Sequence, residues 1–184
     1  MGPRIFTTSQ WVPYPVELVF AFFANPSNLV HLTPPGLKMR IESLQIVPPP
    51  SRPPVQEPSR RFHSLAAGAG SELGLSFRPF PRLPLRLHWT ARIVEFAWNS
   101  HFVDEQLRGP FARFRHRHGI EPGKRSGTEG TLVSDEVEFV LRGGWLGALL
   151  ASRVRRQLES QFAFRRERLE AVLEAAARQA RGQR

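Results

Sequence analysis

Two histidines supply the most reactive chemistry in this sequence, and their spacing predicts that they share one face of a β-sheet. His116 and His118 alternate with Arg115 and Arg117 in the segment FARFRHRHGI. Successive side chains of a strand point to opposite faces, so both imidazoles should lie on one side and the arginines on the other. An imidazole beside a carboxylate can act as a general acid or base near neutral pH.

One carboxylate that could join these histidines is Asp135. In the segment TLVSDEVEFVL it alternates onto one face with Val133 and Val137, while Glu136 and Glu138 fall on the other. An acidic row opposite the arginine row would be favourable across an antiparallel strand pair. That match predicts Asp135 on the histidine side of the sheet.

A second carboxylate, Asp104, lies in the segment FVDEQL before the Gly109-Pro110 turn. In one register, Asp104 and Gln106 lie on the histidine face. A turn longer by one residue would instead point Val103, Glu105 and Leu107 inward, because a one-residue slip reverses every side chain of a strand. Both registers remain open from the sequence.

The sequence leaves three uses for this polar group. The two imidazoles can be hydrogen-bonded inside a cavity, since buried polar groups need partners. They can exchange protons with a carbonyl compound that then cyclises or loses water, with His116, His118, Asp104 and Asp135 as the catalytic candidates. They can also bind a metal with Asp104 or Asp135 as a third ligand. Because no histidine follows His118, neither a metal nor a cofactor is predicted.

Composition excludes several other kinds of site. The chain has 184 residues and no cysteine, which rules out disulfides, thiolate zinc sites and cysteine nucleophiles. It has no GxSxG motif, and its glycine-rich segment GAGSELG precedes a strand rather than a helix, unlike a nucleotide-binding loop.

The net charge of +10 rests almost wholly on arginine, because only Lys38 and Lys124 are lysines. Such a bias is typical of a GC-rich genome, and the arginines are spread along the chain, so no nucleic-acid partner is predicted. No apolar run of signal-peptide or membrane-spanning length occurs, and the longest apolar stretch covers only 145–151. We therefore expect no membrane insertion and a cytoplasmic location.

Periodicity and turn residues predict a single domain over residues 1–184. A proline- and glycine-rich loop at 48–70, either a surface excursion or a lid, interrupts the strands, and a tail at 179–184 should fray. A long amphipathic helix at 146–178 carries an apolar stripe that includes Leu146, Leu150, Val154, Leu158 and Phe162. Strands are predicted at 4–11, 38–47, 71–78, 85–96, 100–107, 110–122 and 128–141, and short helices at 16–25 and 27–35.

This order of elements, with the motifs FxDxQxxGPFxxFxHxH and TxxxDxVxF, resembles the START-related lipid-transfer and polyketide-cyclase (SRPBCC) superfamily. Within it, the similarity points to the bacterial cyclase/dehydrase-like or coenzyme-Q-binding-like branch. The resemblance implies an α+β helix-grip fold. In that fold a curved antiparallel sheet of six to seven strands wraps around a long C-terminal helix, and two short helices follow the first strand.

The resemblance also implies an apolar cavity between sheet and helix. Our first hypothesis is that this cavity binds a hydrophobic small molecule such as a lipid, an isoprenoid or a polyketide-like compound. The alternatives are a cyclase or dehydratase that uses a His–Asp pair, and a module associated with ribosomes or protein partners; the oligomeric state is not predicted. The expected ligand-binding residues are Trp89, Phe102, Gln106, Phe114, His116, His118, Phe139, Leu158 and Phe162.

Overall fold

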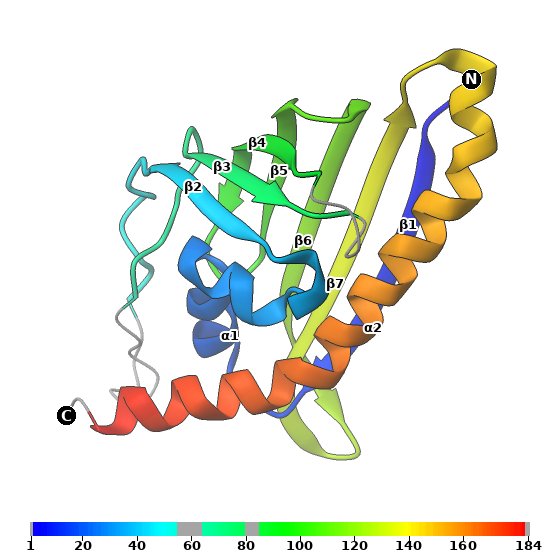
Figure 1. The fold of residues 1–184 in the computed structure, drawn as a ribbon. Coiled ribbons are helices and arrows are strands. Elements are labelled where there is room, and N and C mark those ends of the chain that lie inside the picture. Colours follow the sequence, from blue (N-terminus) through cyan, green and yellow to red (C-terminus); the bar gives the residue numbers. More distant parts are fainter. Residues whose placement is uncertain (1, 55–63, 80–84, 183–184) are drawn as a thin grey trace.

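One curved antiparallel sheet holds a long helix against its concave face in the computed structural model, which describes residues 2–54, 64–79 and 85–182 (Figure 1). The seven strands have the spatial order β1-β7-β6-β5-β4-β3-β2. This architecture confirms the predicted α+β class. The strands are β1 (Arg4–Val12), β2 (Arg40–Gln45), β3 (Glu72–Phe77), β4 (Leu87–Ala97), β5 (His101–Arg108), β6 (Phe111–Arg125) and β7 (Thr128–Leu141).

The longest strands, β6 and β7, form the hairpin that carries the histidines. Their connection has positive φ angles at Ser126 (50°) and Gly127 (80°), as a two-residue turn matched to the twist of the strands requires. The register then runs without interruption from the pair Arg125–Thr128 to the pair Arg113–Val140. The local turn therefore fixes which side chains of β7 face the histidines.

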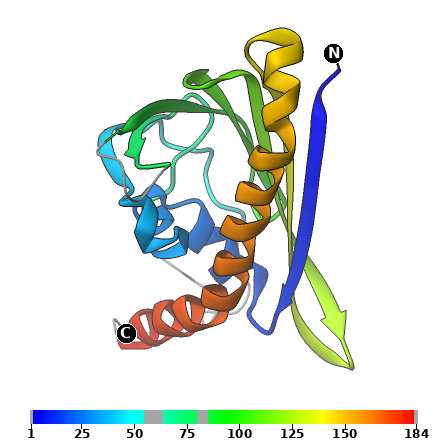
Figure 2. The same cartoon turned by 45° about the vertical axis from the view of Figure 1, so that its right-hand side comes forward.

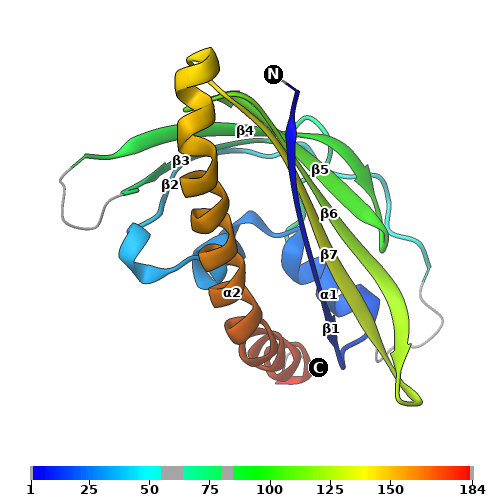
Figure 3. The same cartoon turned by 90° about the vertical axis from the view of Figure 1, so that its right-hand side faces the viewer.

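Three short helical segments follow β1, where the proline pattern predicted two. Helix α1 (Val16–Phe23) begins after Pro15, and the 3-10 helices η1 (Pro26–Leu32) and η2 (Pro35–Leu37) each begin with a proline. The side chain of Asn25 accepts a hydrogen bond from the backbone N–H of Ser27, which starts η1. These segments lie beside α2 on the concave face of the sheet (Figures 1 and 3).

The C-terminal helix α2 (Gly144–Gly182) starts after Gly143, whose φ of 89° favours glycine. It runs along the sheet and changes direction near its middle, so that its second half passes below α1 (Figure 2). Its buried stripe includes Leu158, Leu169 and Leu173. The predicted stripe is wrong at Leu150, which is 56% exposed.

Two clusters of buried side chains flank the middle of the concave face. One joins α1 to the second half of α2 and includes Phe20 and Leu173; the other joins β6 and β7 to the first half of α2 and includes Phe139 and Leu158. No helix of the described residues has the length and apolarity needed to cross a membrane.

The proline-rich segment after β2 is irregular in its described parts, 46–54 and 64–70, yet it is bonded to the rest of the chain. The Trp98 indole donates to the carbonyl of Pro50 at 2.7 Å, and the backbone N–H of Ala67 donates to Ala24 O at 2.9 Å. These bonds anchor both sides of the predicted loop, one beside the end of β4 and the other beside α1. Residues 55–63 of the predicted loop at 48–70, and the last two residues of the predicted tail, lie outside the described residues.

On the convex face, two arginines of β6, Arg113 and Arg115, meet carboxylates from several strands. Arg113 lies 3.4 Å from Glu138, as expected from the charge pattern. Arg115 stands opposite Glu138 in the register but forms its ion pairs with Glu95 and Glu105 of the strands on its other side. The acidic neighbours of this arginine row thus come from β4 and β5 as well as β7.

Candidate functional site

The strand register brings the four predicted catalytic residues together on the concave face. Asp104 of β5 stands opposite His116 of β6, and His118 of β6 stands opposite Asp135 of β7. Asp104 therefore lies on the histidine side, which is the first of the two registers considered. The imidazole rings have centroids 3.7 Å apart.

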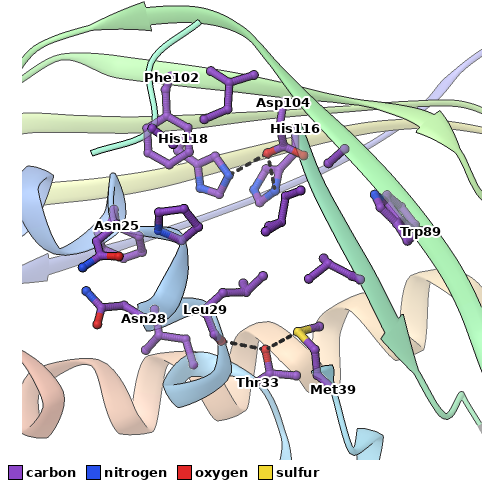
Figure 4. A pocket seen from close by; sticks show the side chains of 18 of the residues that line it. Asn25, Asn28, Leu29, Thr33, Met39, Trp89, Phe102, Asp104, His116 and His118 are labelled. Carbon is purple, nitrogen blue, oxygen red and sulfur yellow. Dashed lines mark hydrogen bonds and ion pairs between the residues drawn. The ribbon is translucent and has the colours of Figure 1, made fainter. Parts of the chain in front are cut away.

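The closest hydrogen bonds of this group run diagonally across the strands, and Figure 4 shows the contacts of Asp104 with both imidazoles. His116 Nε2 lies 2.9 Å from Asp135 Oδ1, and His118 Nε2 lies 3.0 Å from Asp104 Oδ2. A carboxylate can only accept, so each of these ring nitrogens carries the proton. His118 Nδ1 lies 3.2 Å from Asp135 Oδ1 but is not oriented for a hydrogen bond, so that contact is electrostatic.

Arg165 of α2 completes the group, and the sequence analysis missed it. Its Nη1 donates to Asp135 Oδ1 at 2.9 Å, and its guanidinium lies 4.5 Å from the ring of Phe23 and 5.4 Å from that of Phe162. The signal was present in the sequence, because Arg165 lies between Phe162 and Leu169 on the buried stripe of the helix. A buried arginine on such a stripe needs a carboxylate partner.

Burial and charge set the protonation of the group. Burial is the largest influence on His116 and lowers its pKa, and the neighbouring His118 lowers it further. Burial also opposes the charge of His118, but its contacts with Asp104 and Asp135 outweigh burial and raise its pKa. Burial opposes the charge of Asp135 as well, yet Arg165 and both imidazoles hold the pKa of this carboxyl well below its ordinary value.

These shifts favour one shared proton on the imidazole pair, held by His118. Two imidazolium rings at this separation would repel each other. Neutral His116 donates through Nε2, so its Nδ1 keeps a lone pair that can take a proton or bind a cation. This nitrogen lies 3.8 Å from Asp104 Oδ2.

A cavity of about 280 Å³ lies between the sheet, η1 and α2, and Asp104, His116 and His118 form part of its wall (Figure 4). Most of the wall is apolar. Phe102 stacks on His118 with centroids 4.2 Å apart, and Phe162 meets His116 edge to face at 5.7 Å. The expected ligand-binding residues that line the cavity are Trp89, Phe102, Phe114, His116, His118, Leu158 and Phe162.

Gln106 and Phe139 do not line this cavity, which corrects the expectation for both. The Gln106 amide bridges the β5–β6 turn, donating to Phe111 O at 2.9 Å and accepting from Phe111 N at 3.2 Å. Gly109 leaves room for this amide, because a Cβ there would lie 2.3 Å from Gln106 Oε1. Phe139 is 2% exposed and packs within the β6–β7 core. Asp135 also lies behind the wall and reaches the cavity through His116.

The wall opposite the histidines comes from η1 and its flanks, which the sequence analysis did not connect with a site. It includes Asn25, Asn28, Leu29 and Thr33. Their polar atoms are engaged locally: Asn28 donates to Phe22 O at 2.9 Å, and Thr33 donates to Leu29 O at 2.8 Å. Nothing in the sequence pattern of this short segment signals the fold-back that places it over the sheet.

Comparisons with known proteins find similarity to solved structures only. No protein-family model matches the chain, and no curated protein matches it. Among solved structures, TTHA0849 from Thermus thermophilus is 20% identical with a TM-score of 0.61, over 94% of this chain and 99% of that one. Ara h 8.0201 is 14% identical with a TM-score of 0.59, over 95% and 99%.

An enzyme is also among the similar structures. A point mutant of norcoclaurine synthase from Thalictrum flavum, in complex with a transition-state analogue, is 10% identical with a TM-score of 0.59, over 94% of this chain and 95% of that one. At these identities the likeness concerns the backbone arrangement. The chain thus has the helix-grip fold, with a seven-stranded antiparallel sheet around its long C-terminal helix.

Proposed function

We propose that this chain binds an apolar small molecule bearing one polar group in the cavity between the sheet and α2. The observation that carries the proposal is a cavity of about 280 Å³ whose wall is largely apolar and in which Asp104, His116 and His118 form one polar group. Small-molecule sites commonly combine apolar walls with a few placed polar groups.

The apolar wall would supply most of the affinity. An aromatic ligand that buries about 200 Å² of apolar surface gains about 5 kcal/mol from leaving water. Trp89, Phe102 and Phe114 offer aromatic surface on the sheet side, and Leu29 and Leu32 close the other side. The imidazoles would select the ligand by its polar group, because a ligand without one leaves their buried polar atoms unpaired.

The similar structures are consistent with a small aromatic ligand. Norcoclaurine synthase from Thalictrum flavum was solved in complex with dopamine and hydroxybenzaldehyde, and that chain is 13% identical to this one with a TM-score of 0.56. Both molecules pair an aromatic ring with polar substituents. A lipid or isoprenoid tail would need to be short to fit the volume given above.

The test is direct detection of a bound molecule. We expect native mass spectrometry of the purified chain to show an additional mass that organic extraction removes. The extracted protein should then bind the apolar fluorophore 8-anilinonaphthalene-1-sulfonate (ANS) with one site and enhanced emission. Absence of both a co-purified molecule and a saturable ANS site in the folded chain would refute the proposal.

Acid–base catalysis is a second candidate, favoured by one specific observation. Both imidazoles line the cavity and each hydrogen-bonds a carboxylate. Neutral His116 would accept a proton at Nδ1 from an acidic C–H of the ligand, and the cationic His118 would stabilise the resulting enolate. Cyclisation or loss of water could follow from that intermediate.

Deuterium exchange tests this candidate once a ligand is extracted. We expect the native chain in D2O to exchange an acidic C–H of the extracted molecule, and the His116→Gln variant to lose most of that rate, roughly 100-fold or more. The ligand mass should increase by the number of exchanged protons. Equal exchange by both proteins, or none by the native chain, would exclude His116 as the base.

The charges on the protein surface give less support to a role as a partner-binding module. It requires unpaired positive charge, whereas Arg113 and Arg115 of β6 have carboxylates within 4.0 Å, among them Glu138 and Glu95. The cytoplasmic location remains a prediction.

A further inference from the structure

We propose that Asp104, His116 and His118 bind a divalent transition-metal ion of the Zn²⁺ type at the polar end of the cavity. The inference goes beyond ligand binding and stands without it. It also differs from the sequence-based expectation of no metal, which rested on the lack of a third histidine. The sequence left Asp104 or Asp135 open as a third ligand, and the tertiary structure places an oxygen of Asp104 within 4.8 Å of a ring nitrogen of each histidine.

The three side chains present their ligand atoms to one point. One donor atom from each lies within 4.8 Å of the others. Asp104 Oδ2 lies 3.0 Å from His118 Nε2 and 3.8 Å from His116 Nδ1. Two donors at bond lengths of about 2.0–2.1 Å in a tetrahedral site lie about 3.3 Å apart. The two separations from Asp104 bracket that value.

The remaining ring nitrogens supply an independent observation. His116 Nε2 lies 2.9 Å and His118 Nδ1 lies 3.2 Å from the same oxygen, Asp135 Oδ1. Histidines that bind metals usually donate their other ring N–H to a carboxylate, which fixes the tautomer and the ring orientation. One buried carboxylate behind both rings serves that purpose for the two ligands together.

The His118 Nδ1 atom has no hydrogen-bond partner in its present orientation. When His118 releases its Nε2 proton to solvent and this nitrogen turns from Asp104 toward a shared ion, a small rotation of the ring would bring Nδ1–H into line with Asp135. The metal would thus replace the direct Asp104–His118 contact and leave both imidazoles hydrogen-bonded to Asp135.

Charge indicates what else the ion would bind. Asp135 is neutralised by Arg165 at 2.9 Å, so a divalent ion with neutral imidazoles and Asp104 carries a local charge of about +1. A hydroxide or one anionic oxygen of a ligand would balance that charge. The cavity borders the three ligands, which leaves room for a fourth donor. Two nitrogens and one oxygen suit Zn²⁺, Fe²⁺ or Co²⁺ better than Mg²⁺ or Ca²⁺.

Metal binding and proton exchange are competing uses of the same imidazoles. His116 Nδ1 cannot hold a metal and accept a proton from a ligand at once. A metal titration without organic ligand therefore separates the present inference from both candidate functions. A negative titration leaves the cavity proposal intact, and a chain that binds metal but no ANS leaves the metal site intact.

The experiment is a titration of the full chain with Co²⁺ after treatment with a chelator. We expect one equivalent to bind, with the visible d–d absorption of a four-coordinate site, and Zn²⁺ to displace it. Asp104→Asn and His118→Gln should each weaken binding at least 100-fold, because even loss of a ligand's hydrogen-bond partner costs roughly 10–100-fold. His88→Gln is the matched control, since His88 is exposed on β4, and it should bind as the native chain does.

Folding is followed in parallel by circular dichroism and thermal unfolding. Zn²⁺ should raise the melting temperature of the native chain and of His88→Gln, but not that of the two ligand variants. If a variant fails to fold, the Co²⁺ titration of the native chain still tests the inference. Less than one equivalent, a six-coordinate spectrum of weak surface binding, or undiminished binding by folded Asp104→Asn and His118→Gln would overturn the inference.

Discussion

Asp135→Ala is expected to lower the free energy of unfolding by about 3–5 kcal/mol, the usual cost of leaving a buried charge without its partner. Asp135 is 5% exposed and accepts hydrogen bonds from His116 and Arg165. Alanine would leave the Arg165 guanidinium between two phenylalanine rings with no carboxylate. Urea unfolding at neutral pH measures the change.

Two further variants make this result specific. Glu136→Ala removes the exposed carboxylate next along β7 on the opposite face, and its effect should stay within about 0.5 kcal/mol. The double variant Asp135→Ala/Arg165→Met removes both charges and should recover part of the loss. Equal effects of Asp135→Ala and Glu136→Ala would show that the buried group contributes little.

The contribution of Asp135 to the free energy of unfolding should also decrease at acidic pH. Its folded pKa is held below the unfolded value of about 3.8, so the stabilisation is fully present above that pH and is lost as pH falls through the folded pKa. The difference in stability between the native chain and Asp135→Asn should therefore shrink on acidification below about pH 4. His116 and His118 have pKa shifts of opposite direction, so their contributions near neutral pH oppose each other.

Ala91→Trp is expected to weaken ANS binding by roughly 100-fold, because the indole would occupy space that a ligand needs. Ala91 lies on the inner face of β4 and lines the cavity of about 280 Å³. Excluding about 100 Å² of apolar contact removes about 2.5 kcal/mol, and the loss of polar contacts at the histidines adds to it. Fluorescence titration of the extracted protein provides the affinity.

The matched control is Ala112→Trp, which adds the same side chain at an exposed position of β6. It should leave ANS affinity unchanged within about twofold. Tryptophan at a buried position costs about 1–3 kcal/mol in overpacking, so thermal unfolding must show that Ala91→Trp is folded at the assay temperature. Undiminished ANS binding by the folded Ala91→Trp variant would place the ANS site outside this cavity.

Much of the sheet could be predicted from short-range patterns in the sequence. The period of two along 113–118 and 131–141 placed His116, His118 and Asp135 on the inner face, because side-chain direction in a strand depends only on the backbone pleat. The prolines and Asn25 marked the helical segments after β1 for equally local reasons. The exposed Leu150 could not be predicted in this way, since its burial depends on where the sheet ends beneath the helix.

The candidate site, too, was predicted in part from local patterns and decided in part by the tertiary structure. Alternation predicted the inward face of the histidines, but it left two registers open for Asp104, and the pairing of β5 with β6 selected one of them. Gln106 lies on the predicted side but is engaged by the turn that it bridges, a short-range contact that a face assignment cannot detect.

The strand alternation and the amphipathic period of the last segment were sufficient to indicate a series of strands, a long C-terminal helix and imidazoles directed inward, because those signals act over a few residues. The helix-grip arrangement of these elements was an expectation from the family resemblance. The Asp135–Arg165 pair joins positions 30 residues apart, and it exists only once α2 lies across β7. Whether space remains beside the histidines depended on the side chains of η1, β4 and α2 all at once. Volume left between packed elements is a property of their joint arrangement, and no single segment encodes it.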